Sequence, residues 1–132
     1  MKKYNNLLAL TFFCGALAVV FGAFGAHWLA EYLAPKQLGS FKTGVLYHFV
    51  HVLAAVSVLI LSENGSKKRL VFSSILFLTG ILLFSGSLYL LATRDLIGIS
   101  NYKLLGPLTP IGGLFFIAAW LNTAIYYYQQ KK

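Results

Sequence analysis

Acidic residues and cysteine are scarce in this chain, and each shortage excludes a class of protein. Only three of the 132 residues are Asp or Glu and 11% are charged, whereas 58% are hydrophobic. A soluble domain of this size carries far more charge on its surface, so the composition excludes an ordinary soluble fold. The single cysteine, Cys14, excludes an internal disulfide, and we interpret it as a small buried hydrophobic side chain.

Catalytic patterns are absent as well. The sequence has no glycine-rich phosphate loop, no Ser-His-Asp or Cys-His arrangement and no paired carboxylates inside an apolar segment. The formal net charge of +8 invites a nucleic-acid interpretation, but the eleven basic residues are spread over separate polar segments and form no single patch. We therefore expect no nucleic-acid partner, no cofactor and no catalytic residue, and we favour a binding or assembly component over an enzyme.

Four long apolar runs fill most of the chain: residues 7–28, 41–61, 70–92 and 110–128. A helix needs about 20 apolar residues to cross a bilayer core of about 30 Å, and each run is long enough. None has the alternation of a barrel strand, and backbone polar groups in lipid must be satisfied within the segment. The sequence therefore predicts one all-α domain over residues 1–132, a bundle of four transmembrane helices.

The basic residues indicate how this bundle is oriented in the cell membrane. Seven of them lie on one side of the predicted spans: Lys2, Lys3, Lys67, Lys68, Arg69, Lys131 and Lys132. Four lie on the other side: Lys36, Lys42, Arg94 and Lys103. Cytoplasmic segments carry the excess of Lys and Arg, so we predict that both termini are cytoplasmic. The first apolar run imitates a signal peptide but continues beyond its cleavage-like residues 16–18, and we expect it to be retained.

Small residues indicate where the predicted helices pack, because membrane helices associate through close contacts at small residues and through interhelical hydrogen bonds. Two stripes lie on opposite sides of the first helix: Gly15, Ala18, Gly22 and Gly25 on one, and Ala9, Ala16 and Ala23 on the other. This helix can therefore pack on two neighbours, one of which can be a second copy of the chain. The third helix presents a further stripe: Ser73, Gly80 and Ser87. On the fourth helix, Asn122 is expected to hydrogen-bond a neighbouring helix.

The polar segment between the second and third runs, residues 62–66, has the sequence Ser-Glu-Asn-Gly-Ser. Asn-Gly is a strong turn signal, because both residues tolerate positive φ angles. We therefore expect a tight turn and an antiparallel hairpin of the second and third helices. Pro35, in the preceding connection, is expected to mark the point where any extension of the first helix stops.

Histidines inside an apolar run are candidate functional residues, because ionisable side chains are costly in a membrane. His48 and His51 are three residues apart, about 60° around a helix, so both can reach one interior point. His27, with Glu31 one turn later, lies at the outer end of the first helix. A zinc or copper site is disfavoured, because His27 and His51 differ in depth by more than about 10 Å.

Two uses of the buried histidines stay open. In the first, neutral imidazoles hydrogen-bond a Ser, Thr or carbonyl group on the next helix. In the second, the protein is a small transporter, channel or proton relay that conducts past His51. Four helices enclose too little space for a wide pore, so this alternative requires a homo-oligomer.

The start of the fourth predicted helix is the second candidate site. Thr109 can cap the helix and Pro110 can occupy its first position, where proline's missing N–H costs nothing. Gly112 and Gly113 would then expose first-turn amides, to which a small anion or a lipid phosphate could bind beside Lys103. In the alternative, the glycines admit a neighbouring helix and the prolines set the entry angle of the chain.

Four motifs, in order along the chain, are similar to those of a small family of integral membrane proteins. They are Gly22-Ala23-Phe24-Gly25-Ala26-His27, residues 41–48 with His51, residues 84–89 and residues 106–113. The chain resembles the bacterial YgdD-like group, also described as domain of unknown function 423, to which the eukaryotic transmembrane protein 256 is similar. The resemblance covers essentially the whole chain, and it implies a four-helix inner-membrane protein of unknown biochemical activity.

The resemblance also selects residues. Those that match the family pattern are His27, His51, Ser85, Ser87, Tyr89, Gly106, Pro107, Thr109, Pro110, Gly112 and Gly113. His48 departs from the pattern, which favours His51 alone over a pair of histidines. We predict a site for a membrane lipid or a small ligand in the outer half of the bundle. Its candidate residues are His51, His48, His27, Ser85, Ser87, Tyr89, Thr109, Gly112 and Gly113.

Overall fold

A computed structural model describes residues 2–130 of the chain, and no strand occurs among them. The elements, in order, are α1 (Lys2–Ala26), α2 (Trp28–Tyr32), α3 (Pro35–Leu61), α4 (Lys68–Gly80), the π-helical turn η1 (Ile81–Ser85), α5 (Gly86–Ile97) and α6 (Leu105–Gln129). α4, η1 and α5 follow one another without a break. The described residues thus form four helices that are long and apolar enough to cross a membrane, as predicted.

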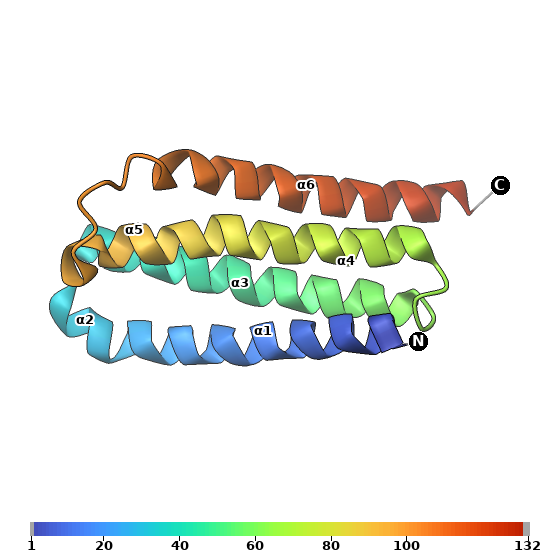
Figure 1. Cartoon of the computed structure of the whole chain (residues 1–132), viewed down its shortest axis with the longest axis horizontal. Coiled ribbons are helices and arrows are strands. Elements are labelled where there is room, and N and C mark those ends of the chain that lie inside the picture. Colours follow the sequence, from blue (N-terminus) through green and yellow to red (C-terminus); the bar gives the residue numbers. More distant parts are fainter. Residues whose placement is uncertain (1, 131–132) are drawn as a thin grey trace.

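Each of the four long helices runs antiparallel to the next one along the chain (Figure 1). α1 and α6 lie on opposite outer sides, and α3 and the α4–α5 helix lie between them. The two ends of the chain and the turn between α3 and α4 share one end of the bundle, whereas α2 and residues 98–104 lie at the other. Lys131 and Lys132, which contribute to the predicted orientation, lie outside the described residues.

The turn between α3 and α4 forms as its Asn-Gly sequence predicts. Glu63, Asn64 and Gly65 have φ angles of 53°, 59° and 85°. Asn and Gly adopt this left-handed conformation more readily than other residues do. The Ser62 hydroxyl accepts a hydrogen bond from the Gly65 amide at 3.1 Å. The expected antiparallel hairpin of two membrane helices is therefore confirmed.

The ends of the first two helices differ from the prediction. α3 begins at Pro35 and not at Phe41, because proline suits the first helical position and the Gln37 side chain accepts a hydrogen bond from the Ala34 amide. Pro35 therefore starts α3, and it follows the extension of the first helix, which ends at Tyr32. At the end of α1, His27 has φ −113° and ψ −82°, which breaks the helix before the short α2.

The predicted start of the last helix is wrong. α6 begins at Leu105 and not at Pro110. Pro107 falls in the first turn, where its missing N–H costs nothing, and Pro110 gives up one bond, to the Gly106 carbonyl. Thr109 therefore lies inside the helix and does not cap it.

One glycine stripe of α1 packs on α3 as predicted. A Cβ added at Gly22 would lie 3.4 Å from Val45, and one added at Gly25 would lie 2.9 Å from Phe41. The opposite stripe is exposed along its length: Ala9, Ala16 and Ala23. A second neighbour for α1 would therefore be another chain, and it stays a prediction.

α6 approaches the π-helical turn closely. A Cβ added at Gly112 would lie 2.3 Å from the backbone nitrogen of Phe84, and one added at Gly80 would lie 2.5 Å from the Phe116 ring. The main apolar core surrounds this contact, between α3, α4, η1 and α6. Glycine is therefore required at both positions, because a side chain would collide with main chain at the first and with a buried ring at the second.

We expect Gly112→Ala to destabilise the protein by about 1–3 kcal/mol or more, because the added methyl group meets main-chain atoms that cannot rotate away. Gly113→Ala is the matched control, since its Cβ would lie 3.8 Å from the Phe84 ring. Thermal unfolding of the purified protein in a mild detergent measures both variants. Equal midpoints for the two variants would contradict the close contact.

Candidate functional site

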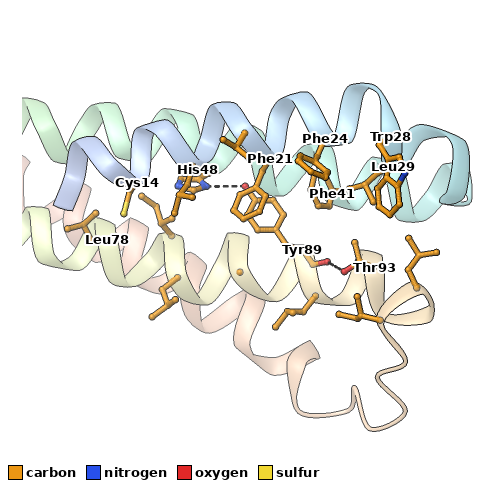
Figure 2. Close-up of a pocket in the computed structure, with 18 residues that line it drawn as sticks. Cys14, Phe21, Phe24, Trp28, Leu29, Phe41, His48, Leu78, Tyr89 and Thr93 are labelled. Carbon is orange, nitrogen blue, oxygen red and sulfur yellow. Dashed lines mark hydrogen bonds between the residues drawn. The ribbon is translucent and has the colours of Figure 1, made fainter. Parts of the chain in front are cut away.

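An apolar groove of about 800 Å³ lies between α1 and the α4–α5 helix, with α3 as its floor (Figure 2). Cys14 and Leu78 line the end of the groove near the middle of the bundle, and Trp28 lines the end beside α2. Lining side chains such as Phe24 and Leu90 remain 51% and 41% exposed. The groove is therefore open along the bundle and is not an enclosed cavity.

The polar side chains of the groove come from α3 and α5. The His48 ring and the Tyr89 hydroxyl are joined by a hydrogen bond of 3.1 Å, and the Thr93 hydroxyl donates to the Tyr89 carbonyl. The Tyr89 ring is held between Phe21 and Phe41, with ring centroids 4.6 and 4.9 Å away. Of the predicted site residues, only His48 and Tyr89 line the groove.

The proton positions of the His48–Tyr89 pair follow from the available partners. The Tyr89 hydroxyl has one acceptor among residues 2–130, Nδ1 of His48, so we assign the proton of this bond to the tyrosine. A neutral imidazole then carries its own proton on Nε2. The ring is only 4% exposed, and Nε2 has no hydrogen-bond partner in the described part of the chain.

The unpaired Nε2 is an unusual feature of the groove. The Cys14 main chain approaches the His48 ring, but not at a geometry that satisfies the nitrogen. A buried donor without an acceptor costs about 1–3 kcal/mol.

His51 lies on a different side of α3 from the groove. Its Nδ1 donates to the Tyr47 carbonyl at 2.7 Å, and its ring stacks on Phe116 with centroids 3.5 Å apart. Phe77 and Trp120 complete the surroundings of the ring. The prediction that the two buried histidines reach one interior point is wrong, because one faces α1 and α5 and the other faces α4 and α6.

The predicted serine and threonine hydroxyls join helices. Ser85, which is fully buried, donates to the Gly44 carbonyl of α3 at 2.7 Å. The hydroxyl oxygens of Ser87 and Thr109 lie 2.6 Å apart, between α5 and α6. Thr109 therefore links two helices instead of capping one.

The predicted anion site at the start of the fourth helix does not form. Because α6 begins at Leu105, the amides of Gly112 and Gly113 lie well inside the helix and are not free. Both glycines pack against Phe84. The alternative, in which they admit a neighbouring helix, is confirmed.

His27 and Glu31 are exposed at the end of the bundle and do not line the groove. They belong to the break between α1 and α2 and to α2 itself. Within residues 2–130, no three His, Cys, Asp or Glu side chains gather closely enough to hold a metal ion. The described residues therefore supply no ligand set that joins His27 to the buried histidines.

Asn122 hydrogen-bonds a neighbouring helix, as predicted. Its Nδ2 donates to the Arg69 carbonyl and to the Ser73 hydroxyl, at 3.1 and 2.8 Å. Its Oδ1 accepts a hydrogen bond from Nε of Arg69 at 2.9 Å. These bonds fix α6 to α4 near the chain termini, at the end of the bundle opposite to α2.

A family model described as "Protein of unknown function (DUF423)" matches residues 21–113. The chain belongs to the DUF423 family. A UPF0382 membrane protein of Haemophilus influenzae is 41% identical over 98% of this chain and 97% of its own length. UPF0382 membrane protein YwdK of Bacillus subtilis is 41% identical over 83% and 85% of the two chains. UPF0382 inner membrane protein YgdD of Escherichia coli is 35% identical over 80% and 76%. No solved structure matches this chain.

Membership of the DUF423 family confirms the resemblance drawn from the four motifs. The matched residues include the end of α1 (residues 21–26), all of α3 and the α4–α5 helix, and so the greater part of the groove. Sequence reasoning missed the groove itself. A signal was present, since Phe21, Phe24 and Trp28 recur on one face of a helix at intervals of three and four residues.

The hydrogen bond between Ser87 and Thr109 predicts energetic coupling in this DUF423 protein. In a double-mutant cycle of Ser87→Ala and Thr109→Val, we expect a coupling of about 0.6–1.7 kcal/mol, the range of interhelical bonds in membranes. Unfolding of the four proteins in a denaturing detergent titration measures it. Additive effects would instead favour separate roles for the two hydroxyls.

Proposed function

We propose that this protein binds a neutral, chain-like apolar molecule from the lipid bilayer in the groove between α1 and the α4–α5 helix. The observation that carries the proposal is the groove itself, about 800 Å³ of apolar space lined in part by His48, whose buried Nε2 has no hydrogen-bond partner among the described residues. Its size is within the range of ligand pockets in proteins, and its lining of aromatic and aliphatic side chains with few polar groups is typical of them.

The polar groups must supply the selectivity of such a site. Lipid tails are as apolar as the lining of the groove, so burial of apolar surface does not favour one membrane molecule over another. The groove can therefore select one membrane molecule over another only by its shape and by hydrogen bonds. With the proton assigned to Nε2, His48 offers a donor beside the groove, so the molecule that fits best carries an acceptor, such as a carbonyl oxygen, next to this ring.

The depth of His48 narrows the chemical class further. The residue is half-way along α3, so it lies near the middle of the membrane-spanning length. The polar groups of a phospholipid lie in the interfacial region, roughly 15 Å from the bilayer centre. The acceptor therefore belongs to a molecule that dissolves within the hydrocarbon, such as a prenylated quinone or another long-chain ketone.

Binding is favoured over conduction by the surroundings of His51. A proton relay needs polar side chains on both sides of the histidine, whereas aromatic rings surround His51 and its recorded hydrogen bond goes to the main-chain carbonyl of Tyr47. The exposed alanine stripe of α1 supports an assembly role besides binding. We propose that a second copy of the chain packs there, because small residues allow close approach of membrane helices.

We further propose that both termini are cytoplasmic and that the groove opens in the outer half of the inner membrane. The excess of Lys and Arg at the end that holds the termini supports this orientation. The relatives named as membrane proteins, and YgdD as an inner membrane protein, support the location.

Reporter fusions test the orientation. An enzyme that is active only in the cytoplasm should be active when fused after Lys132 and inactive when inserted within residues 98–104. An exported reporter at the same two positions should give the opposite result. The reverse pattern at both positions would refute the orientation.

Filling the groove should remove its ligand. Gly86 lines the groove and has open space at its Cβ, so we expect Gly86→Phe to fold normally and to lose a co-purified or added prenyl quinone by at least about tenfold. Gly106→Phe is the matched control, because Gly106 also has open space but lies outside the groove. Mass spectrometry of organic extracts from the purified proteins in nanodiscs measures the bound molecule.

His48→Phe tests the hydrogen bond separately from the shape. It should weaken binding of the same quinone by about 3- to 30-fold, which corresponds to one interhelical-strength hydrogen bond of about 0.6–2 kcal/mol. If Gly86→Phe and Gly106→Phe retain quinone equally, or if wild-type protein binds none, the proposed function is wrong.

A further inference from the structure

A second groove, of about 560 Å³, lies at the end of the bundle opposite to α2, whereas the first groove extends from the middle of the bundle to α2. It lies between the start of α1 and the start of α4, beside the turn that joins α3 to α4, where the N-terminus is drawn in Figure 1. Its lining divides into a polar part, formed by Lys3, Asn6, Asn64 and Lys68, and an apolar part. No residue is shared with the first groove.

The shape of this second groove is held by Tyr4. Its hydroxyl donates to the Leu59 carbonyl at 3.1 Å, and its ring packs against Gly65, where an added Cβ would lie 3.2 Å from it. These contacts hold the first turn of α1 against the turn before α4. Lys3 and Lys68 therefore line one groove although they are far apart in the sequence.

The charge of the polar part is uncompensated within the described residues. Neither Lys3 nor Lys68 forms an ion pair there. Glu63 is the acidic residue nearest in sequence to Lys68, and it pairs with Lys67, whose pKa is raised by the hydrogen bond to that carboxylate. The groove therefore presents two ammonium groups and two side-chain amides, and no carboxylate lines it.

The apolar part continues from these cations into the membrane-spanning segments. It is formed by Leu7 and Leu10 of α1 and by Val71 and Ile75 of α4. Leu10 and Ile75 remain 51% and 43% exposed, so this wall faces the surrounding lipid. A molecule that satisfies both parts has a negatively charged head group joined directly to an apolar chain.

We propose that the second groove binds an anionic phospholipid. The phosphate lies between Lys3 and Lys68, with the Asn6 and Asn64 amides as further donors, and one acyl chain lies along the apolar wall. Free phosphate satisfies only the polar part, and an acidic segment of a soluble protein satisfies no more. Basic residues next to a membrane span attract anionic lipid heads at close range, which agrees with the position of both lysines.

The test uses the full chain, purified in a mild detergent and titrated with phosphatidylglycerol or phosphatidylcholine in native mass spectrometry. Wild-type protein should prefer phosphatidylglycerol by about 30-fold, the combined effect of two lysines close to an anionic lipid. The double variant Lys3→Gln/Lys68→Gln should bind both lipids equally. Lys36→Gln/Lys103→Gln removes the same charge at the other end of the bundle and should keep the preference.

Three outcomes would overturn the proposal. The first is equal binding of the two lipids by wild-type protein. The second is an equal loss of preference in both double variants, which would indicate a general effect of net charge. The third is displacement of bound phosphatidylglycerol by millimolar inorganic phosphate, which would indicate an anion site without a lipid chain. Val71→Trp provides a separate check, because it should obstruct the chain and weaken phosphatidylglycerol binding with both lysines intact.

Discussion

The contact between Gly112 of α6 and the backbone of Phe84 is the constraint on which the rest of the bundle depends. Helices in lipid gain little from hiding apolar surface, so close packing and interhelical hydrogen bonds must hold them together. Both occur at this level of the bundle. The π-helical turn brings main chain against main chain, and just after Phe84 the Ser85 and Ser87 hydroxyls form hydrogen bonds with α3 and α6. π-helical turns of this kind are frequently associated with functional sites.

The groove exists because α1 is attached to the bundle along one seam. Its glycine stripe packs on α3, and its other faces are exposed or line the groove. The three remaining helices form the main apolar core without it. As a result, the aromatic side chains of α1 face α5 across a space that no other described helix fills. The His48–Tyr89 pair lies in that space, and its orphaned nitrogen is the clearest polar feature there.

Much of the fold could be predicted from residue patterns, whereas most of the site could not. Span number, the hairpin turn, the packing stripe of α1 and the role of Asn122 follow from hydropathy, turn chemistry and small-residue spacing, which are local properties. The sequence favours a start of α6 at Pro110, whereas the helix begins at Leu105. Either Pro107 or Pro110 can lie in a first helical turn, and only packing on Phe84 distinguishes the two starts. Helical spacing placed His48 and His51 together, but a difference of about 60° is enough to direct the two rings into different interhelical spaces.

The order of the helices along the chain also suits the way in which such a protein enters a membrane. Among the four spans α1 is synthesised first, and beyond Lys3 it carries no charged residue, so it is stable in lipid before its partner α3 follows. α6 is the last of the four, and Asn122 lies in its second half. By then α4, which carries Arg69 and Ser73, is already present, and the amide of Asn122 can be satisfied on arrival. For α6, insertion and folding are thus matched, since the partners that Asn122 requires are present when this span enters.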